Sequence, residues 1–396
     1  MKNRLSAVAV AVLCLALVIG IACGGGEEEE AGVKELKMGV GIPMSGVLGA
    51  VIGIPAKGAF ELANDKIGEF TIAGQEYRWD LIFEDNLMTA AGSVAVTTKF
   101  VFDHNVDFMH HAGGGAGMAA IPTCEEKEII LDMAGGDPSV FIGHPFAFQV
   151  AATWALNIPP LFDWLTKEHP EANRVAISVP DNETGVAVVD ACAAAAQHYG
   201  LEVVASEFVP IEMTEQYPIA TKLMTKNPDI VLGATTLLEA MWEMDYDGLA
   251  ASYYWLEAYA EDTGWDLCQG YLTLMPNPIG DVWPEAMAFA EEYEDRFGAE
   301  LTPAAFWAGN VMYVLTSALE QAGTVDDNEK IRATLETGTF DTMVGPLKYG
   351  GQALNGIGHM LLWPSPILEV IGEGEYRVVA MYTAEETEAI AAEVYK

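Results

Sequence analysis

Two clusters of glycine in the stretch between His110 and Ser139 could bind a small molecule through backbone amides. The clusters are residues 113–117 and 135–136, and each follows a short apolar run that reads as a strand. Loops that follow neighbouring parallel strands lie together at the carboxyl edge of an open α/β sheet, where such sheets bind ligands. Without Cβ atoms, the amides could approach a polar or anionic ligand, and a helix start would add a partial positive charge. Alternatively, the glycines only permit tight strand-to-helix turns.

Glu257 is a second candidate for ligand binding. It ends an aromatic, strand-like run, YYWLE, in which an acid needs a positive or hydrogen-bonding partner. A ligand ammonium could be that partner, although a solvated or salt-bridged loop glutamate fits equally well. The neighbouring Tyr253, Tyr254 and Tyr259 could line an apolar pocket, but aromatic strands more often belong to a core.

The chain lacks the sequence signatures of an enzyme. It contains no G-x-S-x-G, no H-E-x-x-H and no glycine loop that ends in Lys-Ser or Lys-Thr. The first glycine cluster also fails the dinucleotide pattern, because Met118 stands where the third glycine belongs. Adjacent His110 and His111 point to opposite faces of a strand, so we expect one in the core and one near the cleft edge. We therefore predict no catalytic residue, no metal site and no cofactor.

Strands and helices alternate along the chain in two successive units. In the first unit, residues 36–42, 77–83, 106–111 and 129–133 are predicted strands, and residues 55–67, 89–102 and 118–128 are predicted helices, with Pro122 in the first turn of the last one. The pattern restarts with a strand at 174–179 and a helix at 186–199. The predicted fold class is α/β, with two doubly wound lobes, parallel central sheets and a hinge cleft.

The expected organisation has five parts. They are a signal peptide (1–22), a flexible acidic tether (23–35), a first lobe (36–151 plus about 284–342), a second lobe (152–283 plus about 343–383) and an acidic C-terminal segment (384–396).

The N-terminus is typical of a targeting segment. Lys2 and Arg4 precede an apolar stretch at 7–21, and Gly20-Ile21-Ala22-Cys23 resembles the lipobox of bacterial lipoproteins. Cys23 is therefore the predicted lipidation site, although Gly20 replaces the usual aliphatic residue. An ordinary secretory signal or an uncleaved anchor are the alternatives. The segment GGGEEEE that follows suits a charge-extended tether.

Charge and cysteine content exclude several classes. The chain of 396 residues has 58 acidic and 19 basic residues and a net charge of −39, so nucleic acid is not an expected partner. Such a surface suits a saline exterior, and it could also attract cationic solutes. Cys124, Cys192 and Cys268 permit at most one disulfide and have no metal-binding spacing. Cys124 and Cys192 fit buried thiols, because both lie in segments that look helical.

Taken in order, these features resemble the extracytoplasmic solute-binding proteins of ABC importers. The resemblance rests on the lipobox-like signal, the Met44-Ser45-Gly46 turn, the two glycine clusters, the Asn182-Glu183-Thr184-Gly185 loop and the segment DTMVGPL at 341–347. It covers about residues 33–382 and points to the branched-chain amino acid binding proteins and their amide-binding relatives. The resemblance implies a two-lobed protein that closes on a ligand and delivers it to a membrane permease, held near the membrane by a lipid anchor.

The resemblance also implies site residues. The ligand carboxylate would be held by the two glycine clusters, at Gly114, Gly115 and Ala116 and at Gly135, Gly136 and Asp137. Its ammonium group would be held by Glu257, and Thr184 would close on the ligand from the second lobe. Phe306 would form an aromatic wall of the pocket, and Ser45 would bind from the turn after the first strand. Glycines replace the hydroxyl side chains expected in both clusters. That loss costs about 1 kcal/mol per neutral hydrogen bond, leaves room for a bulkier ligand, and puts an acid, Asp137, where it could repel a carboxylate.

The expected ligand is therefore an amino acid, an amide or a small carboxylic acid. Branched-chain amino acids are the default of the family, and an aromatic compound is an option because of the extra room. A ligand-sensing protein of the same fold that acts in signalling is the alternative function, and an exported enzyme is disfavoured.

Overall fold

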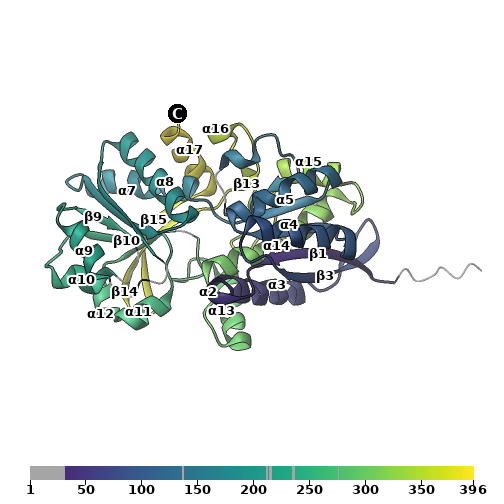
Figure 1. Cartoon of the computed structure of the whole chain (residues 1–396), viewed down its shortest axis with the longest axis horizontal. Helices are drawn as coiled ribbons and strands as arrows, with labels where there is room; N and C mark the ends of the chain where they lie inside the picture. Colours follow the sequence, from purple (N-terminus) through teal and green to yellow (C-terminus); the bar gives the residue numbers. More distant parts are fainter. Residues whose placement is uncertain (1–31, 136–137, 211–212, 214–215, 234–236, 275) are drawn as a thin grey trace, which may run out of the picture.

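The computed structural model describes residues 32–135, 138–210, 213, 216–233, 237–274 and 276–396. Within these residues the chain forms two α/β lobes that lie side by side (Figure 1). The predicted signal peptide, Cys23, most of the tether, Gly136 and Asp137 lie outside the described residues. The predicted α/β class with two lobes and parallel-rich sheets is confirmed.

The first lobe is built on a six-stranded sheet with the order β2-β3-β1-β4-β5-β6. The strands are β1 (Lys34–Ile42), β2 (Phe70–Ile72), β3 (Gln75–Asp85), β4 (Phe108–Ala112), β5 (Ile130–Ala134) and β6 (Ala147–Phe148). All neighbouring strands are parallel except the β2–β3 pair. Because β1, β3, β4 and β5 run in one direction, their carboxyl ends share one edge of the sheet.

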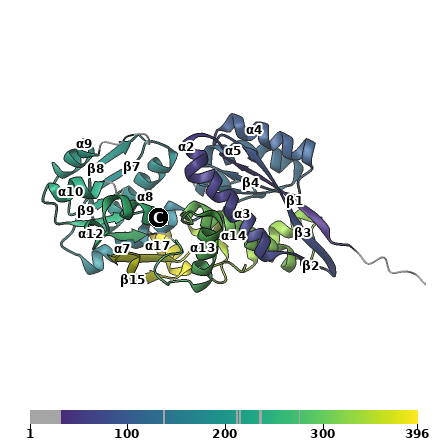
Figure 2. The same cartoon turned by 90° about the horizontal axis from the view of Figure 1, so that it is seen from below.

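Helices cover both faces of this sheet, as Figure 2 shows from below. They are α2 (Gly46–Leu48), η1 (Gly49–Gly53), α3 (Ile54–Ile67), α4 (Ala90–Lys99), η2 (Phe100–His104), α5 (Gly114–Lys127), η3 (Pro138–Phe141), α13 (Pro284–Phe297), α14 (Pro303–Ala322) and α15 (Asn328–Thr337). The stretch Gly46–Ile67 is long and apolar enough to cross a membrane by length and composition alone. Phe60 and the alanines of its inner face are buried, and α3 packs against α14, which is the packing of a core helix.

The second lobe is built on a seven-stranded sheet with the order β15-β14-β11-β10-β9-β7-β8. The strands are β7 (Arg174–Pro180), β8 (Glu202–Val209), β9 (Ile230–Leu232), β10 (Leu249–Ser252), β11 (Leu272–Leu274), β14 (Ser365–Gly372) and β15 (Glu375–Tyr382). The helices are α6 (Trp154–Asn157), α7 (Pro159–Glu168), α8 (Glu183–Tyr199), α9 (Tyr217–Met224), α10 (Leu238–Glu243), α11 (Glu257–Thr263), α12 (Trp265–Cys268) and α17 (Ala384–Val394). Five strands are parallel, while β14 and β15 join antiparallel and were not predicted.

The chain passes between the two sheets three times. It leaves β6 for β7, returns from β11 to α13 and α14, which pack on α3, and then re-enters the second sheet at β14. The last passage contains the short β12 (Tyr349–Gly350), α16 (Gln352–Asn355) and β13 (Met360–Leu361). At this junction, Trp363 donates its indole N–H to the carbonyl oxygen of Val150 at 2.6 Å. The residue boundaries of the lobes stay a prediction.

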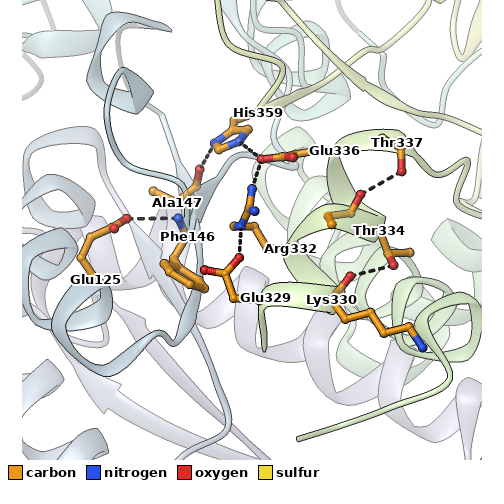
Figure 3. A network of polar contacts seen from close by, with 11 residues as sticks. Glu125, Phe146, Ala147, Glu329, Lys330, Arg332, Thr334, Glu336, Thr337 and His359 are labelled. Atoms are coloured by element: carbon orange, nitrogen blue, oxygen red, sulfur yellow. Dashed lines mark hydrogen bonds and ion pairs between the residues drawn. The ribbon is translucent and has the colours of Figure 1, made fainter. Parts of the chain in front are cut away.

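A polar network braces the same junction (Figure 3). The Nδ1 atom of His359 lies 2.8 Å from the carbonyl oxygen of Ala147, and its Nε2 atom lies 3.3 Å from Oε1 of Glu336 in α15. Arg332 forms ion pairs with Glu336 and with Glu329 on the same helix. Burial lowers the pKa of His359 against the opposing effect of Glu336. The network therefore ties β6 and the β13 segment to α15.

Three local predictions were wrong. Gly114, Gly115 and Gly117 belong to the first turns of α5 instead of a loop, and Pro122 lies inside that helix instead of in its first turn. The aromatic residues 253–256 follow β10 as a loop instead of extending a strand. No structure was predicted for the C-terminal acidic segment, which forms a helix, α17, with a capping box between Thr383 and Glu386.

Both histidines of β4 are buried in the core, so the expectation of one near the cleft edge was wrong. His110 is 2% exposed, and its Nδ1 atom lies 2.6 Å from Oδ2 of Asp132. His111 is fully buried on the other face, where its ring nitrogens contact Ser93 and Thr97. Burial lowers the pKa of His111 to about 3, so it stays neutral in a structural role.

Candidate ligand-binding site

The ends of β4 and β5 bring the two glycine clusters together. The N–H of Gly113 donates to the carbonyl oxygen of Ala134 at 2.9 Å, which joins the two strand ends. Gly113 has φ of 93° and Gly135 has φ of 79°, conformations that side chains disfavour. A Cβ atom on Gly135 would stand 3.8 Å from the amide nitrogen of Gly114. The predicted meeting of the two strand-end loops therefore occurs, through glycines that the turns themselves require.

The first turn of α5 carries amides that have no partner within the helix, and one of them contacts the second lobe. Gly114, Gly115 and Ala116 are the first three residues of the helix, and such amides have no partner within a helix. The N–H of Gly115 donates to Oε2 of Glu183 at 3.1 Å. Glu183 is the first residue of α8, so this contact joins the two lobes.

The segment Asn182-Glu183-Thr184-Gly185 is a helix start. The side chain of Asn182 accepts a hydrogen bond from the N–H of Gly185 at 3.0 Å and caps α8. Thr184 is half-buried in the first turn of α8, next to Glu183. The structure thus brings Thr184 to the same region as Gly115. Reasoning from the sequence missed Glu183, which a helix-capping interpretation of this segment would have placed at an exposed helix start.

Ser45 lies at the same edge of the first sheet, after β1. It is exposed and stands at the N-cap of α2 without a capping hydrogen bond. Burial raises the pKa of neighbouring Asp85, but hydrogen bonds from the amides of Met44 and Leu87 and from Ser45 outweigh burial and lower it. Asn86, which is fully buried, donates to the carbonyl oxygens of Gly41 and Ala112 and so pins the ends of β1 and β4. Sequence reasoning also missed Asn86.

Glu257 lies in a different place, a cavity of about 510 Å³. Its Oε1 atom accepts a hydrogen bond from the hydroxyl of Tyr376 at 2.7 Å, and its N–H donates to Glu300 at 2.9 Å. The other acidic residues that line this cavity are Asp281, Glu291, Glu294, Glu300 and Glu375. Among the residues that the structure describes, none of the other predicted ligand-binding residues lines this cavity. Its role in holding an ammonium group stays a prediction.

Glu300 is the most perturbed acid of this cavity. Burial raises its pKa to about 7, and the negative charges of Glu257 and Glu261 act in the same direction. Hydrogen bonds from the amides of Glu257 and Ala258 oppose this rise. Glu300 therefore changes charge near neutral pH.

Aromatic side chains cluster where α14 meets the second lobe. Phe306 is fully buried, with its ring 5.7 Å from that of Trp363. The next residue, Trp307, lies edge to face with Trp154 at 6.4 Å, and Trp154 contacts Tyr253 at 5.4 Å. Trp154 is half-buried. The structure thus adds Trp154 and Trp307 as aromatic candidates beside the predicted Phe306.

Buried thiols account for the cysteines that the structure describes. Cys124, Cys192 and Cys268 are free and at most 1% exposed. Burial raises the pKa of the Cys124 thiol to about 12 and that of the Cys268 thiol to about 11. These thiols are chemically inert in the folded state. Within the described residues there is also no group of three or more His, Cys, Asp or Glu side chains that could hold a metal ion.

The structure has two α/β lobes joined by three passages, and the start of α5 in one lobe contacts the start of α8 in the other. This is the architecture of a two-lobed solute-binding protein of the type I periplasmic fold. Residues 35–362 match the model of the family described as Periplasmic binding protein, and the chain belongs to that family. The family comprises transport-associated solute-binding proteins rather than enzymes, and its members act outside the cytoplasm.

Solved structures share this fold at low sequence identity. A solute-binding protein of an ABC transporter from Rhodopseudomonas palustris BisB5, in complex with 3,4-dihydroxybenzoic acid, is 18% identical with a TM-score of 0.73, and the match covers 88% of this chain and 98% of that one. The leucine-binding protein LivK from Thermotoga maritima is 17% identical with a TM-score of 0.69, covering 88% and 99%. LivJ from Streptococcus pneumoniae, in complex with isoleucine, is 18% identical with a TM-score of 0.69, again covering 88% and 99%.

Proposed function

We propose that this protein captures a small amino acid, amide or carboxylic acid between its two lobes and delivers it to the permease subunits of an ABC transporter. The observation that carries the proposal is the juxtaposition of the α5 amides of one lobe with the start of α8 in the other, beside the strand-end glycines. Free amides at a helix start suit a polar or anionic group. The aromatic residues Trp154, Tyr253 and Trp307 form an apolar cluster where α14 meets the second lobe.

The ligand class is supported by what structural relatives hold. Proteins of this fold have been solved with isoleucine and with 3,4-dihydroxybenzoic acid, which are an amino acid and an aromatic acid. Branched-chain amino acids are the default, and an aromatic ligand suits the glycine-lined edge. Sugars and metal ions are outside the proposed class.

Thermal-shift screening tests this class. A ligand that binds only the folded state stabilises it by about 2.7 kcal/mol at a hundredfold excess over its Kd. We expect raised melting temperatures with one or more of the branched-chain amino acids, their amides or the benzoates, followed by calorimetric titration of each hit. Stabilisation by sugars or metal ions alone would contradict the proposed ligand class.

We further propose that Cys23 carries a lipid that anchors the protein outside the cytoplasm. The support is the sequence Gly20-Ile21-Ala22-Cys23 and the acidic tether after it. The variant Cys23→Ala should lose incorporation of labelled palmitate and move from the membrane fraction to the soluble fraction. Cys14→Ala, in the apolar part of the signal, is the matched control and should keep both. Unchanged labelling of Cys23→Ala would contradict the anchor.

A further inference from the structure

The contact between Glu183 and Gly115 joins two elements that belong to different lobes. α5 packs on β4 and β5 of the first sheet, and α8 packs on β7 and β8 of the second. Both views of the molecule show these helices in separate lobes (Figures 1 and 2). A hydrogen bond of 3.1 Å from the amide of Gly115 to Oε2 of Glu183 connects them. This bond can exist only while the lobes are close together.

The geometry around Gly115 accommodates the whole carboxylate. A Cβ atom on Gly115 would stand 2.9 Å from Oε1 of Glu183, closer than real Cβ contacts come. The space left by the missing side chain is therefore occupied by Glu183. At Gly115 a side chain of the protein itself therefore fills the room that was expected for a bulkier ligand, whereas a Cβ atom on Gly135 would meet only the amide nitrogen of Gly114, at 3.8 Å.

Within the described part of the chain, the partner of the Glu183 carboxylate is a backbone amide rather than a Lys or Arg side chain. The carboxylate lies at the start of its own helix, α8, and at the start of α5, which have 17 and 14 residues. Both helix starts carry a partial positive charge that favours an anion. The arrangement is that of an exposed carboxylate bound to one helix-start amide, except that the carboxylate belongs to the protein.

We propose that Glu183 is a built-in competitor of ligand carboxylates: it holds the lobes together when no ligand is present, and it selects ligands that present a neutral amide or a cationic group to α5. This inference rests on the proposed solute-binding function and narrows its ligand class. A ligand carboxylate must displace Glu183 from the amide of Gly115 and leave two negative charges side by side. An amide or ammonium group instead donates a hydrogen bond to Glu183.

Matched ligand pairs test the selection. The probes are L-leucine with L-leucinamide, and benzoate with benzamide, titrated by calorimetry into the wild-type protein, Glu183→Gln and Asp181→Asn. Asp181→Asn removes the same charge from an exposed residue two positions before Glu183, just outside α8, and is the control. We expect Glu183→Gln to shift affinity toward the carboxylate member of a pair at least tenfold, and Asp181→Asn to shift it less than threefold. An unchanged ratio for Glu183→Gln would overturn the selection.

A second measurement needs no ligand. Spin labels at Glu126→Cys in α5 and Gln197→Cys in α8, both exposed positions, report the distance between the lobes. We expect Glu183→Gln to lengthen or broaden the distance distribution of the ligand-free protein. Gly115→Ala should act likewise, because its Cβ displaces Glu183 without removing a charge. Unchanged distributions in both variants would overturn the role of Glu183 in holding the lobes together.

The two measurements separate failure of the inference from failure of the proposed function. If amides and carboxylates bind with an unchanged ratio, solute binding stands and the selection by Glu183 is wrong. If no probe binds any variant while the distance distributions lengthen, the contact between the lobes stands and the proposed ligand class is wrong.

Discussion

Replacement of Glu300 by Gln should stabilise the protein, and the gain should depend on pH. Glu300 lies between α13 and α14, and it accepts hydrogen bonds from the amides of Glu257 and Ala258 at 2.9 and 3.3 Å. A glutamine oxygen can keep the shorter of these bonds. The substitution removes a negative charge from a cavity that is lined by five further acidic residues: Glu257, Asp281, Glu291, Glu294 and Glu375.

The size of the gain follows from the pKa of Glu300. Burial raises this pKa from 4.5 to about 7 in the folded protein. The folded state therefore binds the proton on Glu300 more tightly than the unfolded state does. The contribution of Glu300 to the free energy of unfolding is thus highest below pH 4.5 and falls as the pH rises through 7. The full difference corresponds to about 3 kcal/mol. Because Glu300 is half-buried, we expect about 1–2 kcal/mol after screening by solvent.

Urea unfolding followed by tryptophan fluorescence measures this effect. At pH 8, Glu300→Gln should raise the free energy of unfolding by about 1–2 kcal/mol, and the gain should shrink at pH 5. Glu291→Gln, which removes an exposed carboxylate from the same cavity, should change it by less than about 0.5 kcal/mol. A Glu300→Gln protein that is less stable at pH 8, or whose gain does not change with pH, would refute the reasoning.

Three further substitutions test how the fold is held together, each measured by urea unfolding. Asp132→Ala leaves buried His110 and the amide of Val150 without their partner and should cost about 3–5 kcal/mol; a loss below 1 kcal/mol would contradict it. Trp363→Phe removes the hydrogen bond to the carbonyl oxygen of Val150 and should cost about 1–3 kcal/mol, whereas an unchanged midpoint would argue against this link. Thr383→Ala removes the cap of α17 and should cost about 1 kcal/mol, and equal stability would show that the capping box contributes nothing.

The alternation of strands and helices was predictable because most parallel strands are buried apolar runs. In β4, for example, every residue from Phe108 to Ala112 is buried. The pair β14 and β15 escaped prediction because β15 has no buried residue and carries no clear alternation. The turn between the two strands, Gly372-Glu373-Gly374, is the one feature of the sequence that could have indicated a hairpin here.

The start of α5 was misplaced because glycine has low helix propensity. Packing overrides that preference here: Ala116 and Gly117 are buried against the first sheet, and a Cβ atom on Gly117 would meet the side chain of Met133 at 2.7 Å. Local sequence therefore indicated a loop where tertiary contacts require small residues in a helix. Because the predicted helix began at residue 118 instead of Gly114, Pro122 was assigned to the first turn although it lies inside the helix.

Only the part of the candidate site that lies within one lobe could be predicted from the sequence. The meeting of Gly113 and Gly135 follows from parallel strand order alone. The contact of Glu183 with Gly115 depends on how two lobes close, which no local pattern encodes. The cavity around Glu257 likewise requires residues from α13 and from the β14–β15 turn, far away in sequence.

The central claim is that the protein binds a small amino acid, amide or carboxylic acid without changing it. The most direct measurement is mass spectrometry of the small molecule released when the purified protein is denatured. We predict one equivalent of a compound from this class, chemically unaltered. A sugar or a metal ion at one equivalent would contradict the ligand class, and turnover of the bound compound would contradict a binding function.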